Sequence, residues 1–286
     1  HPNLSEFQHP LLLKIFCTVN KGKHDFDIYG TSLTESMQKY SEQMIESVAD
    51  KEKPDYDIRR YEIKNGLRNY AQTIWDTDLR DMLYVPDFYE KFEKHEYAQK
   101  IVDEGCCSTE MEATECYVHF TYDMIAGYHI AEQIIATHPQ KADFVSYITS
   151  QQAKLFGKEC HTYGQDIVKS LVFLVPQKYG EQWSTLVPTA DTVAATIENL
   201  DGVFASANGR ETLQAIIANS KNDNSMKEQL CECIYHRVQN EHNLSHFKEF
   251  LQLFAIMQPS EIDEYWNGRF ITYPEMQSVR NQLHDD

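Results

Sequence analysis

The sequence predicts an all-α fold, arranged as a multi-helix bundle or as a short, solenoid-like stack of α-hairpins, with about 10–12 helices and no significant sheet. Glycine and proline are scarce, at 11 and 9 of 286 residues, which leaves few turns and favours long helices. Apolar residues recur at helical spacing through most of the chain, and helix-start patterns recur with them. The best strand candidate is 171–175, but its neighbours keep helical spacing.

Caps and prolines mark the helices of the first 105 residues. Ser32-Leu33-Thr34-Glu35 matches a capping box and predicts a helix that continues to about Val48. Pro54 suits the first position of a second helix, whose apolar stripe continues to Trp75. Pro86 opens a third helix, which should end at Gly105, because glycine adopts a left-handed backbone without strain.

The helices expected after residue 105 follow from the same signals. Thr109-Glu110-Met111-Glu112 matches a second capping box and predicts a helix over 109–137. Pro176 should end the helix expected over 159–175, and the helices from residue 189 onward should be arranged in pairs. The remaining helices are expected at 140–156, 159–175, 189–207, 210–219, 225–240 and 245–257.

Two regions are expected within the chain. Residues 1–180 should form an N-terminal helical bundle, and residues 181–286 a C-terminal helical-hairpin region packed on it. The segment 176–188, with prolines at both ends, is the best candidate for the boundary. A single continuous domain is the alternative.

The composition excludes several classes of function. Forty-four acidic against 26 basic residues give a net charge of −18, which argues against nucleic-acid binding and against adsorption to anionic lipid. No apolar run approaches the roughly 20 residues of a membrane span, so no membrane insertion is expected. The odd number of cysteines, seven, favours a reducing, cytoplasmic location. Phosphate-binding loops and the common catalytic motifs are absent, and no cofactor is predicted.

The segment 101–140 is unusual because it has seven carboxylates and no Lys or Arg. On the helix expected over 109–137, Glu112, Glu115, His119 and Asp123 would share one face. We therefore predict that these four residues bind a protein partner with a basic surface. A divalent-cation site is an alternative, and a solvated outer face of an amphipathic helix is a third interpretation.

Two further clusters suggest chemistry. Cys116 and His119 could form a nucleophile–base pair, although catalytic partners usually come from distant elements. A second cluster has the ligand types of a zinc site, but its spacing is poor: Cys231, Cys233, His236, His242 and His246. Catalytic and metal-binding residues are therefore left unassigned.

The favoured function is a helical protein-interaction module that binds a basic protein segment through an acidic surface. The alternatives are a hydrolase or transferase with a pocket of dispersed His, Cys and acidic residues, and a metal-binding helical protein. The composition, rich in Asn, Gln and Lys within helices, resembles that of effector proteins that intracellular bacteria deliver into host cells; no residue-level motif accompanies it. This resemblance implies a location in the bacterial cytoplasm or the host cytosol.

Overall fold

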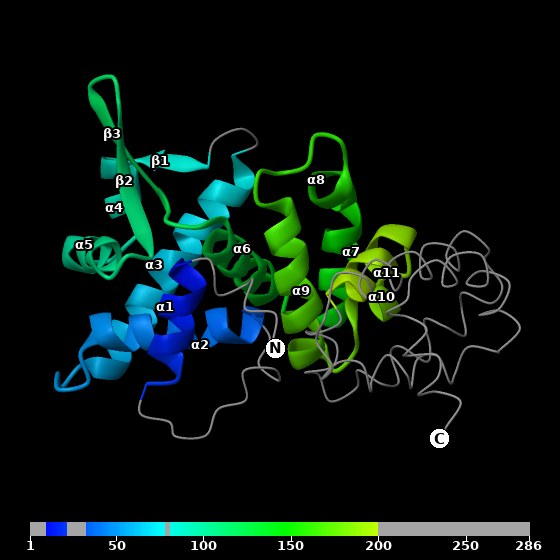
Figure 1. Cartoon of the computed structure of the whole chain (residues 1–286), viewed down its shortest axis with the longest axis horizontal. Coiled ribbons are helices and arrows are strands. Elements are labelled where there is room, and N and C mark those ends of the chain that lie inside the picture. Colours follow the sequence, from blue (N-terminus) through cyan, green and yellow to red (C-terminus); the bar gives the residue numbers. More distant parts are fainter. Residues whose placement is uncertain (1–9, 22–32, 78–80, 200–286) are drawn as a thin grey trace, which may run out of the picture. The chain divides into compact units, whose positions relative to one another are not determined.

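The computed structural model describes residues 10–21, 33–77 and 81–199, which are mostly helical and include one small antiparallel sheet (Figure 1). These residues belong to one compact unit, Leu4–Gly209, of the two into which the chain divides. Among them, no helix combines the length and the apolar character that crossing a membrane requires. The helices are α1 (Pro10–Val19), α2 (Leu33–Ala49), α3 (Tyr56–Asp76), α4 (Val85–Tyr89), α5 (His95–Asp103), α6 (Asp123–Thr137), α7 (Lys141–Ser150), α8 (Gln152–Phe156), α9 (Gly164–Tyr179), α10 (Trp183–Leu186) and α11 (Ala190–Glu198). The strands are β1 (Met82–Tyr84), β2 (Cys107–Glu112) and β3 (Glu115–Phe120).

The predicted helices of the first part of the chain are largely confirmed. Helix α2 covers the expected range, and α3 begins two residues after Pro54. The helix expected from Pro86 to Gly105 is divided into α4 and α5. Gly105 has a φ of +83°, so the left-handed end predicted for this segment is present.

The prediction that Pro176 ends a helix is wrong. Helix α9 continues through Pro176 to Tyr179 and ends where Gly180 adopts a φ of +74°. A proline in the last turn removes one backbone donor, and the buried apolar residues around it hold the helix together despite that loss. The strand candidate 171–175 lies inside the same helix.

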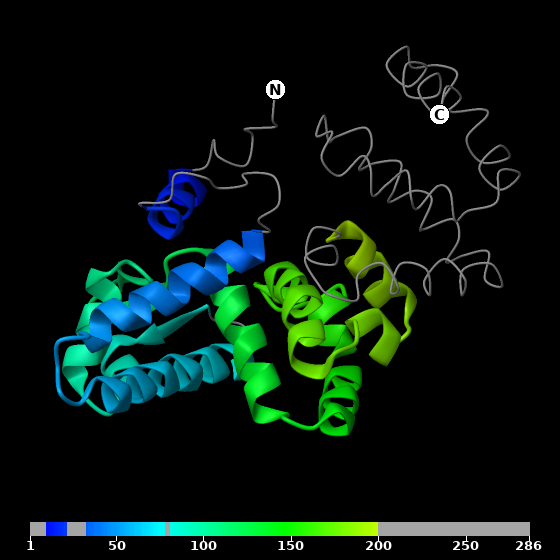
Figure 2. The same ribbon diagram turned by 90° about the horizontal axis from the view of Figure 1, so that it is seen from below.

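The core of the described unit is organised around α6, whose residues 125–131 are all buried. Helix α6 packs against α3 on one side and α9 on another, and α2 lies beside α3 (Figure 2). The α6–α9 contact is very close: a Cβ at Gly127 would lie 2.5 Å from the backbone carbon of Asp166. Glycine is therefore required for α6 and α9 to approach as they do.

The prediction of no significant sheet holds only roughly, because the described residues include one small three-stranded antiparallel sheet. After Gly105, β2 and β3 form a hairpin, and the earlier strand β1 pairs with β3. The helix expected over 109–137 therefore begins only at Asp123. Val118, Tyr117 and Phe120 favour strands, and apolar residues alternate along β3. The capping-box match at 109–112 was fortuitous, since these residues lie in β2.

Of the helices predicted after residue 189, the described residues include only the first part. Helix α11 confirms the start of the helix expected at 189–207, and Thr189 caps it through a reciprocal capping box with Thr192. The helices expected at 210–219, 225–240 and 245–257 lie outside the described residues. The domain boundary near residue 180 stays a prediction for the same reason.

Candidate functional site

The β2–β3 hairpin is closed by a two-residue turn, Ala113-Thr114, in which Ala113 has a φ of +53°. Glu112 and Glu115 are the paired residues on either side of the turn. A pair separated by only two residues must exchange both of its backbone hydrogen bonds, and the bonding alternates from there along the ladder. The hairpin register is therefore fixed by the turn, and the faces of the sheet follow from it.

One face of the sheet packs on the core. Cys107, Val118 and Phe120 alternate with outward residues and are almost completely buried. The hydroxyl of Tyr70, on α3, donates a hydrogen bond to the Val118 carbonyl oxygen at 3.1 Å. These contacts hold the base of the hairpin against the helices.

The opposite face is polar and acidic. The register places Glu110 beside Tyr117 and Glu112 beside Glu115, and two-residue alternation puts all four side chains on this face. Tyr84 of β1 lies opposite Tyr117, with ring centroids 6.0 Å apart. We call this surface the acidic hairpin face and define it by Tyr84, Glu110, Glu112, Glu115, Tyr117 and His119.

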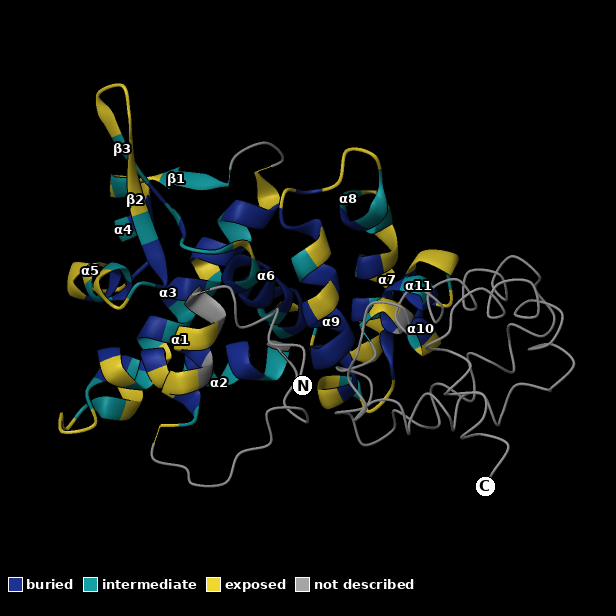
Figure 3. Ribbon diagram, viewed as in Figure 1, coloured by how far each residue is buried: buried dark blue, intermediate teal, exposed yellow. Residues whose placement is uncertain are grey.

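The outer half of the hairpin extends beyond the helices, so both of its faces are open to solvent (Figures 1 and 3). Every residue from 109 to 115 is exposed, and the side chain of Met111 is 64% exposed. A two-stranded ribbon without packing on either face is only marginally stable by itself in water. Cover supplied by a partner would therefore stabilise it.

The structure brings together three of the four predicted partner-binding residues, although not on a helix. Glu112, Glu115 and His119 share the acidic hairpin face because 115 and 119 are an even number of residues apart and 112 pairs with 115. His119 is half-buried; its Nε2 lies 3.3 Å from the Ser108 hydroxyl oxygen, and its Nδ1 lies 2.9 Å from the Phe120 carbonyl oxygen. Asp123 is the first residue of α6, outside the hairpin. The single helical face predicted for these residues is wrong.

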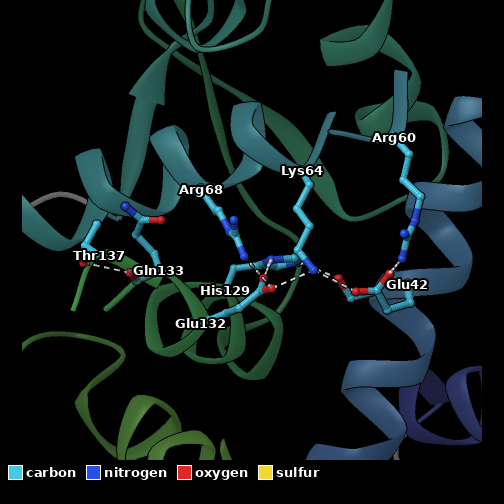
Figure 4. Close-up of polar contacts among 9 residues, drawn as sticks. Glu42, Arg60, Lys64, Arg68, His129, Glu132, Gln133 and Thr137 are labelled. Atoms are coloured by element: carbon cyan, nitrogen blue, oxygen red, sulfur yellow. Dashed lines mark hydrogen bonds and ion pairs between the residues drawn. The ribbon is translucent and has the colours of Figure 1, made fainter. Parts of the chain in front are cut away.

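Within segment 101–140, which has no Lys or Arg, the carboxylate of Glu132 is neutralised by basic residues from a distant part of the chain (Figure 4). One carboxylate oxygen of Glu132, on α6, forms ion pairs with two residues of α3: Lys64 Nζ at 2.9 Å and Arg68 Nη2 at 3.4 Å. Lys64 also contacts Glu42 of α2 at 2.8 Å, and Arg60 contacts the other oxygen of Glu42 at 2.5 Å. These ion pairs connect α2, α3 and α6.

The same ion pairs shift the pKa values of their members. Burial raises the pKa of the Glu42 carboxyl, but the hydrogen bonds and charges of Lys64 and Arg60 outweigh burial and lower it below its ordinary value. Burial lowers the pKa of Lys64, but the charge of Glu132 and the hydrogen bonds to both carboxylates raise it overall. Both groups are therefore held in their charged forms.

The carboxylates of the hairpin are different. Within the described ranges, Glu110, Glu112 and Glu115 make no ion pair with a Lys or Arg. Glu115 accepts a hydrogen bond from the Tyr117 hydroxyl at 2.6 Å, which leaves its charge uncompensated. Nearer the helices, Glu104 accepts a hydrogen bond from Ser47. Three carboxylates without an ion pair among the described residues thus lie together on the exposed part of the hairpin.

Sequence reasoning missed a polar group in the interior, formed by Cys106, His129 and Ser41. Nε2 of His129 lies 4.0 Å from Cys106 Sγ and 3.3 Å from the Ser41 hydroxyl oxygen, and its Nδ1 lies 3.9 Å from Glu132. A hydrogen bond with Cys107 lowers the pKa of the Cys106 thiol; burial opposes this, His129 adds to it, and the result is about 6. No sequence spacing relates these residues, because they come from separate elements.

This interior group brings a thiol and an imidazole together, but it is closed to substrates. Cys106 and His129 are each 1% exposed, and the crevice they line with Tyr40 and Tyr128 has no room for a water molecule. Cys106 and His129 therefore have no substrate-binding space beside them, and the enzyme alternative stays a prediction.

The other predicted chemical sites are not assembled by the described residues. Cys116 and His119 are three residues apart on a strand, so their side chains lie on opposite faces and the nucleophile–base pair is wrong. In ranges 10–21, 33–77 and 81–199, no group of three or more His, Cys, Asp or Glu is placed to hold a metal ion. The Cys and His cluster at 231–246 lies outside these ranges.

Comparison with known proteins supplies no relative: no family model, no curated protein and no solved structure matches the chain.

Proposed function

We propose that this protein is a protein-interaction module that binds a basic segment of a partner protein through the acidic hairpin face. The observation that carries the proposal is the set of three exposed carboxylates, Glu110, Glu112 and Glu115, on one sheet face with no cation beside them among the described residues. Such a field attracts Lys and Arg side chains and repels acidic partners.

The aromatic residues of the face support the same class of partner. Tyr84 is 40% exposed and lies at 60° to the neighbouring ring of Tyr117. A tyrosine ring attracts a cation placed over its face, and an Arg or Lys between ring and carboxylate gains from both. Tyrosine is also enriched at protein interfaces.

The carboxylates of segment 101–140 differ in whether a cation neutralises them, and this difference further supports the proposal. Glu132 is neutralised by α3 and is 16% exposed at its side chain, so its charge serves the fold. The hairpin carboxylates have no such role, and their mutual repulsion weakens the hairpin until positive charge approaches. Partner binding would remove that repulsion.

The experiment is an affinity measurement with a fluorescent octapeptide of alternating Lys and Thr. Replacement of the three carboxylates by amides (Glu110→Gln, Glu112→Gln and Glu115→Gln together) should weaken binding by about threefold or more, since each exposed charge pair contributes roughly 0.2–1 kcal/mol. The matched control removes three exposed carboxylates elsewhere, as Asp143→Asn, Glu159→Gln and Asp191→Asn. Equal weakening in both triple variants would show that only net charge matters and would overturn the proposal.

A further inference from the structure

The hairpin has a second open feature besides its acidic face, namely the outer edge of β2. The strand order is β1-β3-β2, so among the described strands β2 is paired on one side only. An unpaired edge presents backbone N–H and C=O groups that another extended chain can use.

The register identifies which groups are available. Since Glu112 and Glu115 form a hydrogen-bonded pair, so do Glu110 and Tyr117, two residues further along. Met111, between these two pairs, and Thr109, on the other side of Glu110, belong to the alternate pairs that are not hydrogen-bonded to each other. Their N–H and C=O groups therefore point away from β3, toward the open edge. Both residues are exposed.

Proteins usually protect such an edge with Lys, Pro, a bulge or a covering element. Residues 109–112 contain no Lys and no Pro, and β2 pairs with β3 without a bulge in register from residue 107 to residue 112. Within ranges 10–21, 33–77 and 81–199, the protection that this edge carries is the charge of Glu110 and Glu112. Those charges disfavour pairing with a second copy of this chain, which would place like charges side by side, and they favour a strand that carries Lys or Arg.

We infer that the basic partner segment binds as an added fourth strand on the free edge of β2, with its Lys or Arg side chains on the acidic hairpin face. This inference rests on the proposed function and specifies the partner as an extended chain whose basic residues alternate. Backbone hydrogen bonds to Thr109 and Met111 hold the added strand, and the carboxylates of Glu110 and Glu112 select its charge. The exposed side chain of Met111, on the other face, would pack against the intervening residues of the same strand.

The first test uses the unaltered protein and two peptides. The Lys–Thr octapeptide is compared with the same octapeptide carrying a methyl group on every backbone amide nitrogen, which keeps the charges and removes the donors. We expect the methylated peptide to bind at least about tenfold more weakly, the scale of one or more backbone hydrogen bonds. Equal affinity of the two peptides would overturn strand addition.

The second test changes the edge. Proline at position 109 removes an outward N–H while leaving the β2–β3 hydrogen bonds and all charges in place, because edge positions tolerate proline there. Thr109→Pro should therefore weaken binding of the unmethylated peptide about tenfold, whereas Thr109→Ala should leave it within about twofold. Thermal unfolding of both variants shows whether the hairpin base remains folded. Amide hydrogen exchange adds a readout: on binding, the exchange of Thr109 and Met111 should slow.

The outcomes separate the two proposals. Loss of binding in the triple amide variant together with full binding of the methylated peptide supports the acidic face and overturns strand addition. Unchanged binding in the triple amide variant overturns the proposed function and the inference with it. Loss in both experiments, with slowed exchange at Thr109 and Met111, supports both.

Discussion

The different roles of Glu132 and Glu112 give a direct prediction about stability. Replacing Glu132 by Gln leaves Lys64 and Arg68 without the carboxylate that both contact, at 2.9 and 3.4 Å. Removing one partner of a fully buried ion pair costs about 3–5 kcal/mol, and an exposed pair contributes about 0–1 kcal/mol. The side chains of Glu132, Lys64 and Arg68 are 16%, 25% and 30% exposed, which places this network between the two limits.

We therefore expect Glu132→Gln to lower the free energy of unfolding by about 2 kcal/mol, equivalent to a fall of roughly 4–8 °C in Tm for a unit of this size. The same substitution at Glu112, which is exposed and has no described cation beside it, should change stability by less than about 0.5 kcal/mol. Urea denaturation of the wild type and both variants measures these values. A neutral Glu132→Gln, or a Glu112→Gln variant that is equally destabilised, would refute the division between structural and partner-binding carboxylates.

Three further predictions test the core. Gly127→Ala should lower the free energy of unfolding by about 1–3 kcal/mol, because the added Cβ would meet the backbone of α9. This cost exceeds the gain from the better helix propensity of Ala, and an unchanged Tm would contradict the close packing of α6 on α9. The lowered pKa of Glu42 stabilises the fold above pH 4.5, and this stabilisation is lost as the pH falls; the raised pKa of Lys64 stabilises the fold below pH 10.5, and this stabilisation is lost as the pH rises. Glu42→Gln should therefore reduce the fall in the free energy of unfolding that the wild type shows on acidification. An unchanged fall would count against the ion pair. In native protein, alkylation followed by peptide mass spectrometry should modify exposed Cys160 long before buried Cys106; a fast Cys106 would show that the interior thiol is accessible and would favour the enzyme alternative.

Much of the helical architecture could be predicted because long apolar stripes and glycine stops are local signals. The range of α2 and the left-handed end at Gly105 follow directly from them. Pro176 misled the prediction because tertiary burial of α9 outweighs one lost hydrogen bond. In that case the decisive energy came from packing that no local pattern reports.

The hairpin was missed for a related reason. Its turn, Ala113-Thr114, lacks the Gly or Asn that usually marks a two-residue connection, and Ala113 adopts a positive φ that sequence alone does not suggest. The alternation of Cys116, Val118 and Phe120 was the available signal, and the capping-box match at 109–112 concealed it. The sequence predicts one shared face for Glu112, Glu115 and His119 on the basis of a helix that is not present. The strand register nevertheless places the same three residues on one face of the sheet.

The charge of the acidic segment was predictable, but its partners were not. No sequence spacing connects Glu132 with Lys64 or Arg68, which meet it only because α3 and α6 pack together. The same holds for Cys106 and His129 in the interior. Contacts of this kind depend on the topology of the fold, of which a single sequence carries no local record.

NMR chemical-shift mapping shows which residues of the protein the Lys–Thr octapeptide contacts. On titration of the protein with the Lys–Thr octapeptide, the largest amide shifts should fall within residues 108–119, with smaller changes at Tyr84. Shifts centred elsewhere, such as around the exposed Ile58 and Tyr61 of α3, would place the binding surface outside the acidic hairpin face even if the peptide binds tightly.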